Sequence, residues 1–335
     1  MPTLSSYPVR AVLIASVVLA ILLGAGACGG TSGGSGGLRL VAYSTPQEAY
    51  EEIIPAFKQT AAGGGVGFSQ SYGASGDQER AVEAGLKADV VALSLAPDVD
   101  KLVDAGKVAA GWNKDEYDGF VTNSVVVFAV RKGNPKNIRT WDDLIKDGVE
   151  VIEPNPFTSG GAKWNIMAAY GSQLEQGKSP QQARDYLAQL FKNVPVQDKS
   201  AREALQTFVG GKGDVLLAYE NEAITAQQKG EDVDYVVPDE TILIQNPIAV
   251  TTNAKDKAQA FVDFTRSEDA QKIFAEKGYR SVIPSLVDKS RYPTPPGLFE
   301  ITKFGGWDRV NDEFFDPDRG IVAKIEQDLG VSTEK

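Results

Sequence analysis

Four short stretches of the sequence place a serine or threonine at the expected start of a helix. They are Thr45-Pro46-Gln47-Glu48, Ser75-Gly76-Asp77-Gln78, Ser159-Gly160-Gly161-Ala162 and Ser200-Ala201-Arg202-Glu203. Three of the four match a capping box, in which a hydroxyl residue is followed three positions later by Glu or Gln. Each stretch follows an apolar run that is typical of a strand, at residues 38–43, 66–69, 149–152 and 194–196.

A strand, a turn of small residues and a helix start together present free backbone N–H groups and the positive end of a helix dipole. That environment binds anions. One such turn is common in any α/β protein and indicates little by itself. Four of them, two with glycines, predict a site that holds an oxyanion without a fixed countercharge.

The residue types that the chain lacks narrow the chemistry further. It contains no histidine, which excludes a Ser-His-Asp triad, a Cys-His pair and a His-based zinc site. No phosphate-binding P-loop motif occurs, and the glycine-rich run at 63–67 does not match G-x-G-x-x-G. A net charge of −11 argues against a nucleic-acid partner. An enzyme, a metal site and a cofactor are therefore disfavoured, although Glu, Asp, Lys or Tyr chemistry stays open.

The N-terminus has the pattern of an export signal. Arg10 precedes an apolar run at 11–23, which is too short to span a bilayer, and small residues lead to Cys28, the only cysteine. This resembles a bacterial lipoprotein signal, in which the cysteine becomes the acylated first residue. We expect a signal peptide at 1–27 and a flexible Gly/Ser tether at 28–37. An ordinary secretory signal with an incidental cysteine is the alternative.

Beyond residue 37, strand and helix patterns alternate, which favours an α/β fold. A helix starting near 46 places an apolar stripe at i, i+3, i+4 and i+7. The stripe consists of Tyr50, Ile53, Ile54 and Phe57. Further strands are expected at 89–95, 124–130, 214–219 and 247–251, and two late helices near 257–265 and 268–276.

About 300 residues after the signal exceed what one core usually serves, so two domains are expected. No linker divides the chain into consecutive halves, and the extended stretches near 121–130 and 238–250 instead predict crossovers. The expectation is a bilobed molecule with 39–121 and 247–335 in lobe I and 122–246 in lobe II. A small ligand would then bind in the cleft between the lobes.

Several segments, within 38–310, resemble the sulfate-binding proteins that feed sulfate ABC transporters. The most specific is Asn155-Pro156-x-x-Ser-Gly-Gly-Ala-x-Trp-Asn165; the others lie at 71–76, 88–93, 130–136, 213–223 and 304–307. In look and compartment the chain is similar to an actinobacterial lipoprotein version of the family. The resemblance implies a type II periplasmic-binding-protein fold, no catalysis and no cofactor. It also implies a monomer, anchored through Cys28 to the outer face of the cell membrane, that delivers sulfate to membrane permease subunits.

The resemblance also implies which residues hold the anion. In the family, backbone N–H groups at helix starts bind it, matching Ser75, Gly160, Gly161 and Ala201, together with a serine hydroxyl that matches Ser159. Two positions depart from the family pattern, since Tyr219 stands in place of a tryptophan and Ser44 in place of an aspartate.

A pocket of neutral donors suits sulfate because the dianion offers only acceptors. Neutral donors also avoid the desolvation cost of a buried Lys or Arg. The same fold with thiosulfate, molybdate or phosphate as ligand is the alternative, followed by an enzyme or a structural protein of the cell envelope.

Overall fold

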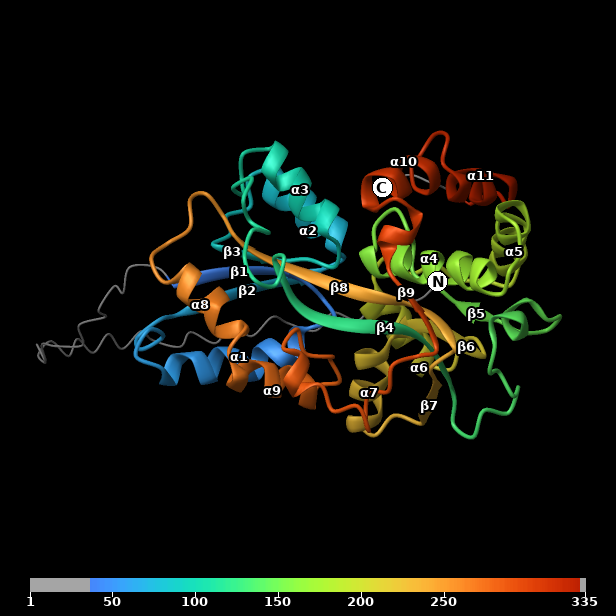
Figure 1. Ribbon diagram of the computed structural model, residues 1–335, viewed down its shortest axis with the longest axis horizontal. Coiled ribbons are helices and arrows are strands. Elements are labelled where there is room, and N and C mark those ends of the chain that lie inside the picture. Colours follow the sequence, from blue (N-terminus) through green and yellow to red (C-terminus); the bar gives the residue numbers. More distant parts are fainter. Residues whose placement is uncertain (1–36, 332–335) are drawn as a thin grey trace, which may run out of the picture. The chain divides into compact units, whose positions relative to one another are not determined.

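The computed structural model describes residues 37–331. The signal peptide and most of the tether, and with them Cys28, lie outside the described residues. Within the described part, strands and helices alternate as the sequence predicts (Figure 1). No helix among these residues is long and apolar enough to cross a membrane.

One mixed sheet runs through the described residues in the order β2-β1-β3-β8-β4-β6-β5. At one end, β2, β1 and β3 are parallel, and at the other end β5 is parallel to β6. The strands are β1 Leu38–Tyr43, β2 Phe68–Gly73, β3 Val90–Ala92, β4 Phe120–Arg131, β5 Val151–Ile152, β6 Val215–Tyr219, β7 Val233–Val236, β8 Glu240–Val250 and β9 Gly297–Phe299.

The two long strands β4 and β8 connect the ends of this sheet. The first half of β4 pairs with β8, and its second half pairs with β6. Strand β8 likewise uses residues 243–247 for β4 and residues 248–250 for β3. These are the two stretches from which crossovers were predicted, and each spans from one set of parallel strands to the other.

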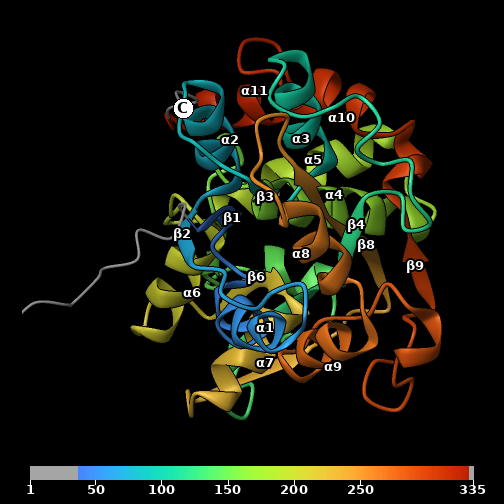
Figure 2. The same cartoon turned by 90° about the vertical axis from the view of Figure 1, so that its left-hand side faces the viewer.

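Helices cover both faces of the sheet (Figures 1 and 2). They are α1 Gln47–Gln59, α2 Ser75–Glu83, α3 Ala96–Asp104, α4 Gly160–Glu175, α5 Pro180–Lys192, α6 Ala201–Val209, α7 Glu220–Gln228, α8 Ala258–Thr265, α9 Glu268–Glu276, α10 Trp307–Phe314 and α11 Ile321–Asp328. The late helices α8 and α9 match their predicted ranges within one residue. The apolar stripe of α1 is confirmed, because all four of its side chains are buried.

Alternation along the strands explains why their sequences are continuously apolar. Leu40 and Ala42 of β1 pack in a cluster with α1, α8 and α9, whereas Val41 between them packs with α2 and α3. In β4, Phe128 faces the cluster of α4 and α5, and Val127 faces that of α6 and α7. Strands covered on both faces need apolar residues at every position.

The C-terminal segment packs on helices α4 and α5. Val310, Phe314 and Val322, from α10 and α11, lie in the same hydrophobic cluster as Trp164 and Leu187 of α4 and α5. The helices near 257–276 pack on β1 and β3. Lobe I was expected to contain all of 247–335, and that division into lobes stays a prediction.

Candidate functional site

The residues expected to hold an anion converge where the parallel strands end. Ser44 follows β1, Ser75 follows β2, Tyr219 ends β6, and the remaining four lie at the starts of α4 and α6. Ligands of open α/β sheets bind in this position, outside the carboxyl ends of the strands. All seven line one cavity of about 10 Å³, comparable to the space that a single water needs. The lining consists of Tyr43, Ser44, Thr45, Gly73, Ala74, Ser75, Ser94, Ser159, Gly160, Gly161, Ser200, Ala201 and Tyr219.

The start of α4 contributes two adjacent backbone donors. Ser159 is the N-cap, and its Oγ accepts the N–H of Ala162 at 3.4 Å. The N–H groups of Gly160 and Gly161 occupy the first two helical positions, which have no acceptor within the helix. A Cβ at Gly160 would lie 2.7 Å from Ser94 Oγ, and one at Gly161 would lie 3.3 Å from Ala201 Cβ. A Cβ at Gly160 would clash with the cavity wall, whereas one at Gly161 would need its neighbours to move by a few tenths of an ångström.

The start of α2 differs from the predicted capping box. Ala74 is the N-cap, so Ser75 is the first helical residue and does not cap with its side chain. Instead its hydroxyl donates to Asp98 Oδ2 at 2.7 Å and accepts the N–H of Ser94 at 2.9 Å. The backbone N–H of Ser75 occupies a position without an acceptor inside the helix. The prediction of a cap was wrong, while the placement of Ser75 beside the cavity follows the expectation.

The stretch at Thr45 is not a cap either. Helix α1 begins at Gln47 after Pro46, and no side chain caps it. Ser200 does cap α6, because its Oγ accepts the N–H of Glu203 at 3.2 Å. Ala201 is therefore the first residue of α6, with its N–H in a position that lacks a helical acceptor.

Ser94 also lines the cavity, although the sequence analysis did not single it out. Its hydroxyl shares a hydrogen bond of 2.7 Å with the hydroxyl of Tyr219. Its carbonyl oxygen accepts from Trp164 Nε1 at 3.0 Å and from Asn246 Nδ2 at 3.1 Å. Ser94 lies two residues after the end of β3, at the same edge of the sheet as Ser44 and Ser75. A polar residue at the end of an apolar run was the pattern from which its place beside the cavity could have been predicted.

The loop after β1 is held by a cation that does not line the cavity. Arg202 Nη2 donates to the carbonyl oxygens of Ser44 at 2.9 Å and Thr45 at 3.3 Å, and its guanidinium pairs with Glu48. Lys229 also pairs with Glu48. Among the described residues, the Ser44 hydroxyl has no hydrogen-bond partner.

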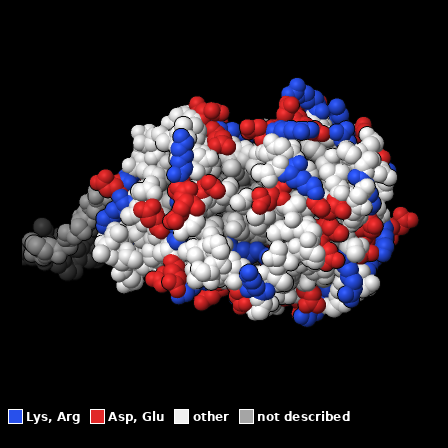
Figure 3. Space-filling view, viewed as in Figure 1, with Lys and Arg blue, Asp and Glu red and all other residues white. Residues whose placement is uncertain are grey.

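No charged side chain lines the cavity, although carboxylates lie close behind it. Burial raises the pKa of Glu222 to about 7, against the lowering effect of the Arg202 charge and of the Tyr219 N–H. Thr45 Oγ1 donates to Glu222 Oε1 at 3.4 Å. Acidic and basic side chains are interspersed over the face drawn in Figure 3. The cavity thus offers uncharged groups inside an acidic protein.

A second buried carboxyl gives a prediction for stability. Burial raises the pKa of Glu326 from its ordinary value of 4.5 to about 7, against a lowering effect of the nearby Gln197 side chain. Neither carboxyl oxygen has a hydrogen-bond partner of good geometry among the described residues. The folded protein therefore holds more protons than the unfolded chain between pH 4.5 and 7, so this group makes stability fall as pH rises through that window.

We expect Glu326→Gln to raise the free energy of unfolding by up to about 3 kcal/mol at pH 8 and to change it little near pH 4.5. The amide reproduces the shape of the protonated carboxyl without its titration. Urea denaturation of both proteins at the two pH values measures the difference. An equal effect at both pH values would contradict the prediction.

Comparison with known proteins places the chain in a family. The model of the bacterial extracellular solute-binding proteins matches residues 38–280. A sulfate-binding protein of Synechococcus elongatus is 43% identical over 93% of this chain and 95% of its own length. A thiosulfate-binding protein of Pseudomonas aeruginosa is 35% identical over 91% of this chain and 97% of its own.

A solved structure supports the same family. The sulfate-binding protein SubI from Mycobacterium tuberculosis superposes with a TM-score of 0.82 at 43% identity, over 84% of this chain and all of SubI. The fold is thus the bilobed α/β fold of the type II periplasmic binding proteins, as the sequence predicts. The chain belongs to the family of bacterial extracellular solute-binding proteins, in the group that contains the sulfate-binding proteins.

Proposed function

We propose that this protein captures sulfate outside the cytoplasm and delivers it to the membrane permease of an ABC transporter. The observation that carries the proposal is the convergence of three helix starts, α2, α4 and α6, on a cavity without a charged side chain. Sulfate offers only acceptors, and backbone N–H groups at helix starts satisfy it without burying a Lys or Arg. The relatives are named as binding proteins, which agrees with a function that is not enzymatic.

The proposed contacts follow from the geometry of the cavity. The N–H groups of Ser75, Gly160, Gly161 and Ala201 donate to the anion, and the hydroxyl of Tyr219 adds a further donor. Ser44 and Ser159 supply two more hydroxyls. Hydrogen bonds to a charged group are about twice as strong as neutral ones, so five to seven of them suffice for tight binding.

Thiosulfate is the second candidate, because one relative carries that name and the two dianions share their chemistry. Sulfate is favoured because the relatives named for it are more similar to this chain. Isothermal titration with sulfate, thiosulfate and molybdate tests the proposal. Saturable heat for one sulfate per chain supports it, and heat with another anion alone would overturn it.

Replacing Tyr219 by phenylalanine is expected to weaken sulfate binding by about 1.5–3 kcal/mol, the range for a hydrogen bond to a charged group. The phenol is buried, and its hydroxyl contacts Ser94 in the cavity wall. Tyr235→Phe is a matched control, because this tyrosine lies in β7 and does not line the cavity. Titration calorimetry of the two variants compares them. Equal sulfate affinities of the two variants would show that the Tyr219 hydroxyl does not contact the anion.

We further propose that the cavity closes between two lobes that meet at β4 and β8. The packing favours residues 39–121 and 247–296 for one lobe, and 122–246 with the C-terminal segment for the other. Contacts such as Ser94 with Tyr219 and the Gly76 N–H with the Thr158 oxygen, at 3.2 Å, would then join the lobes around the ligand.

Anchoring through Cys28 is a separate part of the proposal. If the mature chain begins at an acylated Cys28, Cys28→Ala should leave the protein unprocessed or release it from the membrane. Phase partitioning in detergent distinguishes the two forms. A wild-type protein that partitions wholly into the aqueous phase would show that no lipid is attached.

A further inference from the structure

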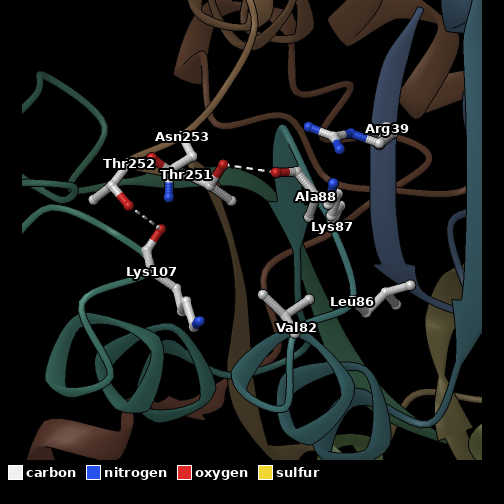
Figure 4. A pocket seen from close by; sticks show the side chains of 10 residues that line it. Arg39, Val82, Leu86, Lys87, Ala88, Lys107, Thr251, Thr252 and Asn253 are labelled. Carbon is white, nitrogen blue, oxygen red and sulfur yellow. Dashed lines mark hydrogen bonds between the residues drawn. The ribbon is translucent and has the colours of Figure 1, made fainter. Parts of the chain in front are cut away.

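A second hollow lies at the end of the sheet opposite the candidate site. This groove, of about 350 Å³, is lined by residues at the amino ends of β1 and β3, at the ends of α2 and α3, and in the loop after β8 (Figure 4). Strand β8 is antiparallel to β3, so its last residues reach the same end. The groove and the anion cavity therefore lie at opposite ends of the same strands.

The groove has an unusual charge for this protein. Its lining contains three basic side chains, Arg39, Lys87 and Lys107, and no carboxylate, whereas the whole chain carries 45 acidic and 34 basic residues. Arg39 is neutralised by buried Asp89, with Nη2 to Oδ1 at 2.7 Å. Neither lysine forms an ion pair with a described residue. The groove thus offers two unpaired positive charges.

The rim of the groove is fixed by local hydrogen bonds. Thr251 Oγ1 donates to the Ala88 oxygen at 2.7 Å, and Thr252 Oγ1 donates to the Gly106 oxygen at 3.0 Å. Beside the lysines, Leu86 is 43% exposed, one of the few large apolar side chains on the described surface. Cations next to an exposed apolar side chain are typical of surfaces that meet a membrane interface.

The described chain begins next to this groove. Lys255 Nζ donates to the Gly37 oxygen at 2.6 Å, and the Lys255 N–H donates to Asp89 Oδ1 at 2.9 Å, so Gly37 is held beside the Arg39–Asp89 pair. From Gly37 back to Cys28 the chain can span at most about 30 Å. An acyl chain on Cys28 would therefore keep the groove near the bilayer surface.

We propose that this groove docks on the membrane by binding the phosphate-bearing headgroup of an anionic phospholipid through Lys87 and Lys107. The inference rests on the proposed lipid anchor. Anionic leaflets attract Lys and Arg near their surface. The short tether raises the local concentration of headgroups, so that weak binding suffices. The docked protein keeps its anion cavity, at the other end of the strands, open to the solvent.

The test uses the mature acylated chain in vesicles of neutral phosphatidylcholine, with or without anionic phosphatidylglycerol. Because Cys28 is the only native cysteine, a fluorophore can be placed at Leu86→Cys or, as the matched control, at exposed Leu329→Cys in the C-terminal part. A spin label on the lipid headgroups then quenches any fluorophore close to the surface.

We expect strong quenching at position 86 and little at 329, only when the anionic lipid is present. In the Leu86→Cys protein, Lys87→Gln with Lys107→Gln should lower the ratio of docked to free protein about 25-fold, about fivefold for each lysine. Lys192→Gln with Lys324→Gln removes the same charge elsewhere and should leave the ratio unchanged.

Equal quenching at both positions, or quenching unaffected by the double substitution at Lys87 and Lys107, would overturn the proposal. Displacement by millimolar inorganic phosphate would instead identify a general phosphate site and also overturn it. Detergent partitioning tests the lipid anchor separately from the docking groove. A chain without a lipid refutes the anchor, whereas an acylated chain without quenching at position 86 refutes only the docking groove. Sulfate titration reports independently on the anion cavity.

Discussion

Gly161→Val is expected to weaken sulfate binding at least about 100-fold while leaving the fold intact. The added Cβ would contact Ala201 Cβ at 3.3 Å, Ser159 Oγ at 3.4 Å and the Tyr219 ring at 3.6 Å, all in the cavity wall. A branched side chain there fills the space of the anion. Its displacement breaks at least two hydrogen bonds to a charged group, each of which contributes about 1.5–3 kcal/mol.

Calorimetry with sulfate measures the loss, and circular dichroism with thermal melting checks the fold. Gly111→Val is the matched control, because a Cβ at this exposed position would meet only Lys114 Cδ, at 3.7 Å. If Gly161→Val binds sulfate within about tenfold of the unchanged protein, the proposed placement of the anion is incorrect.

Sulfate is expected to bind about 10⁴-fold more tightly than phosphate. Phosphate keeps a proton at neutral pH, and that proton needs a buried acceptor. No carboxylate lines the cavity, and Ser44 is a serine at the position where the resemblance implies an aspartate. A phosphate proton would face another donor, and unpaired buried polar groups give discrimination of this size.

Three hydroxyls limit this preference for sulfate. Those of Tyr219, Ser44 and Ser159 line the cavity and can accept as well as donate, whereas an indole N–H in the place of Tyr219 could only donate. The preference should therefore be narrower than in relatives that have tryptophan there. Competition titrations near pH 5 and pH 8 measure it at different phosphate protonation states. Phosphate that displaces sulfate at comparable concentration would refute the assignment of sulfate.

The features of the fold that depend on residues close together in the sequence could be predicted from it. The stripe of α1 follows from periodicity, and β4 and β8 follow from apolar, β-branched runs and the extended stretches around them. The strand expected at 194–196 was wrong, because Val196 forms only an isolated bridge with Ile152. The packing partner of the C-terminal segment could not be predicted, because the amphipathic helices α10 and α11 can pack on any apolar surface. Only the packing shows that this surface is α4 and α5.

The site shows the same limit. The seven residues could be predicted to lie together because strand ends and small residues at helix starts are local patterns. The side-chain partners could not, because they come from distant residues. The Ser75 hydroxyl is bound by Asp98 rather than by its own helix, and Ser94 meets Tyr219, which is 125 positions further along the chain. Local capping rules cannot predict such competition for a hydroxyl.

Strands β4 and β8 each pair with strands from both halves of the sheet, and this has a consequence for the order of folding. Strand β3 pairs early with β1 but joins the rest of the sheet only through β8, whose paired residues come about 160 positions later. Strand β4 needs β6 and β8, which follow it by about 90 and 120 residues. Pairings over such separations form slowly because a long loop must close first. Neither half of the sheet can be completed before residue 250 has emerged. A chain that must cross a membrane before it folds gains from this delay, because its first 240 residues cannot close into the native sheet on the wrong side.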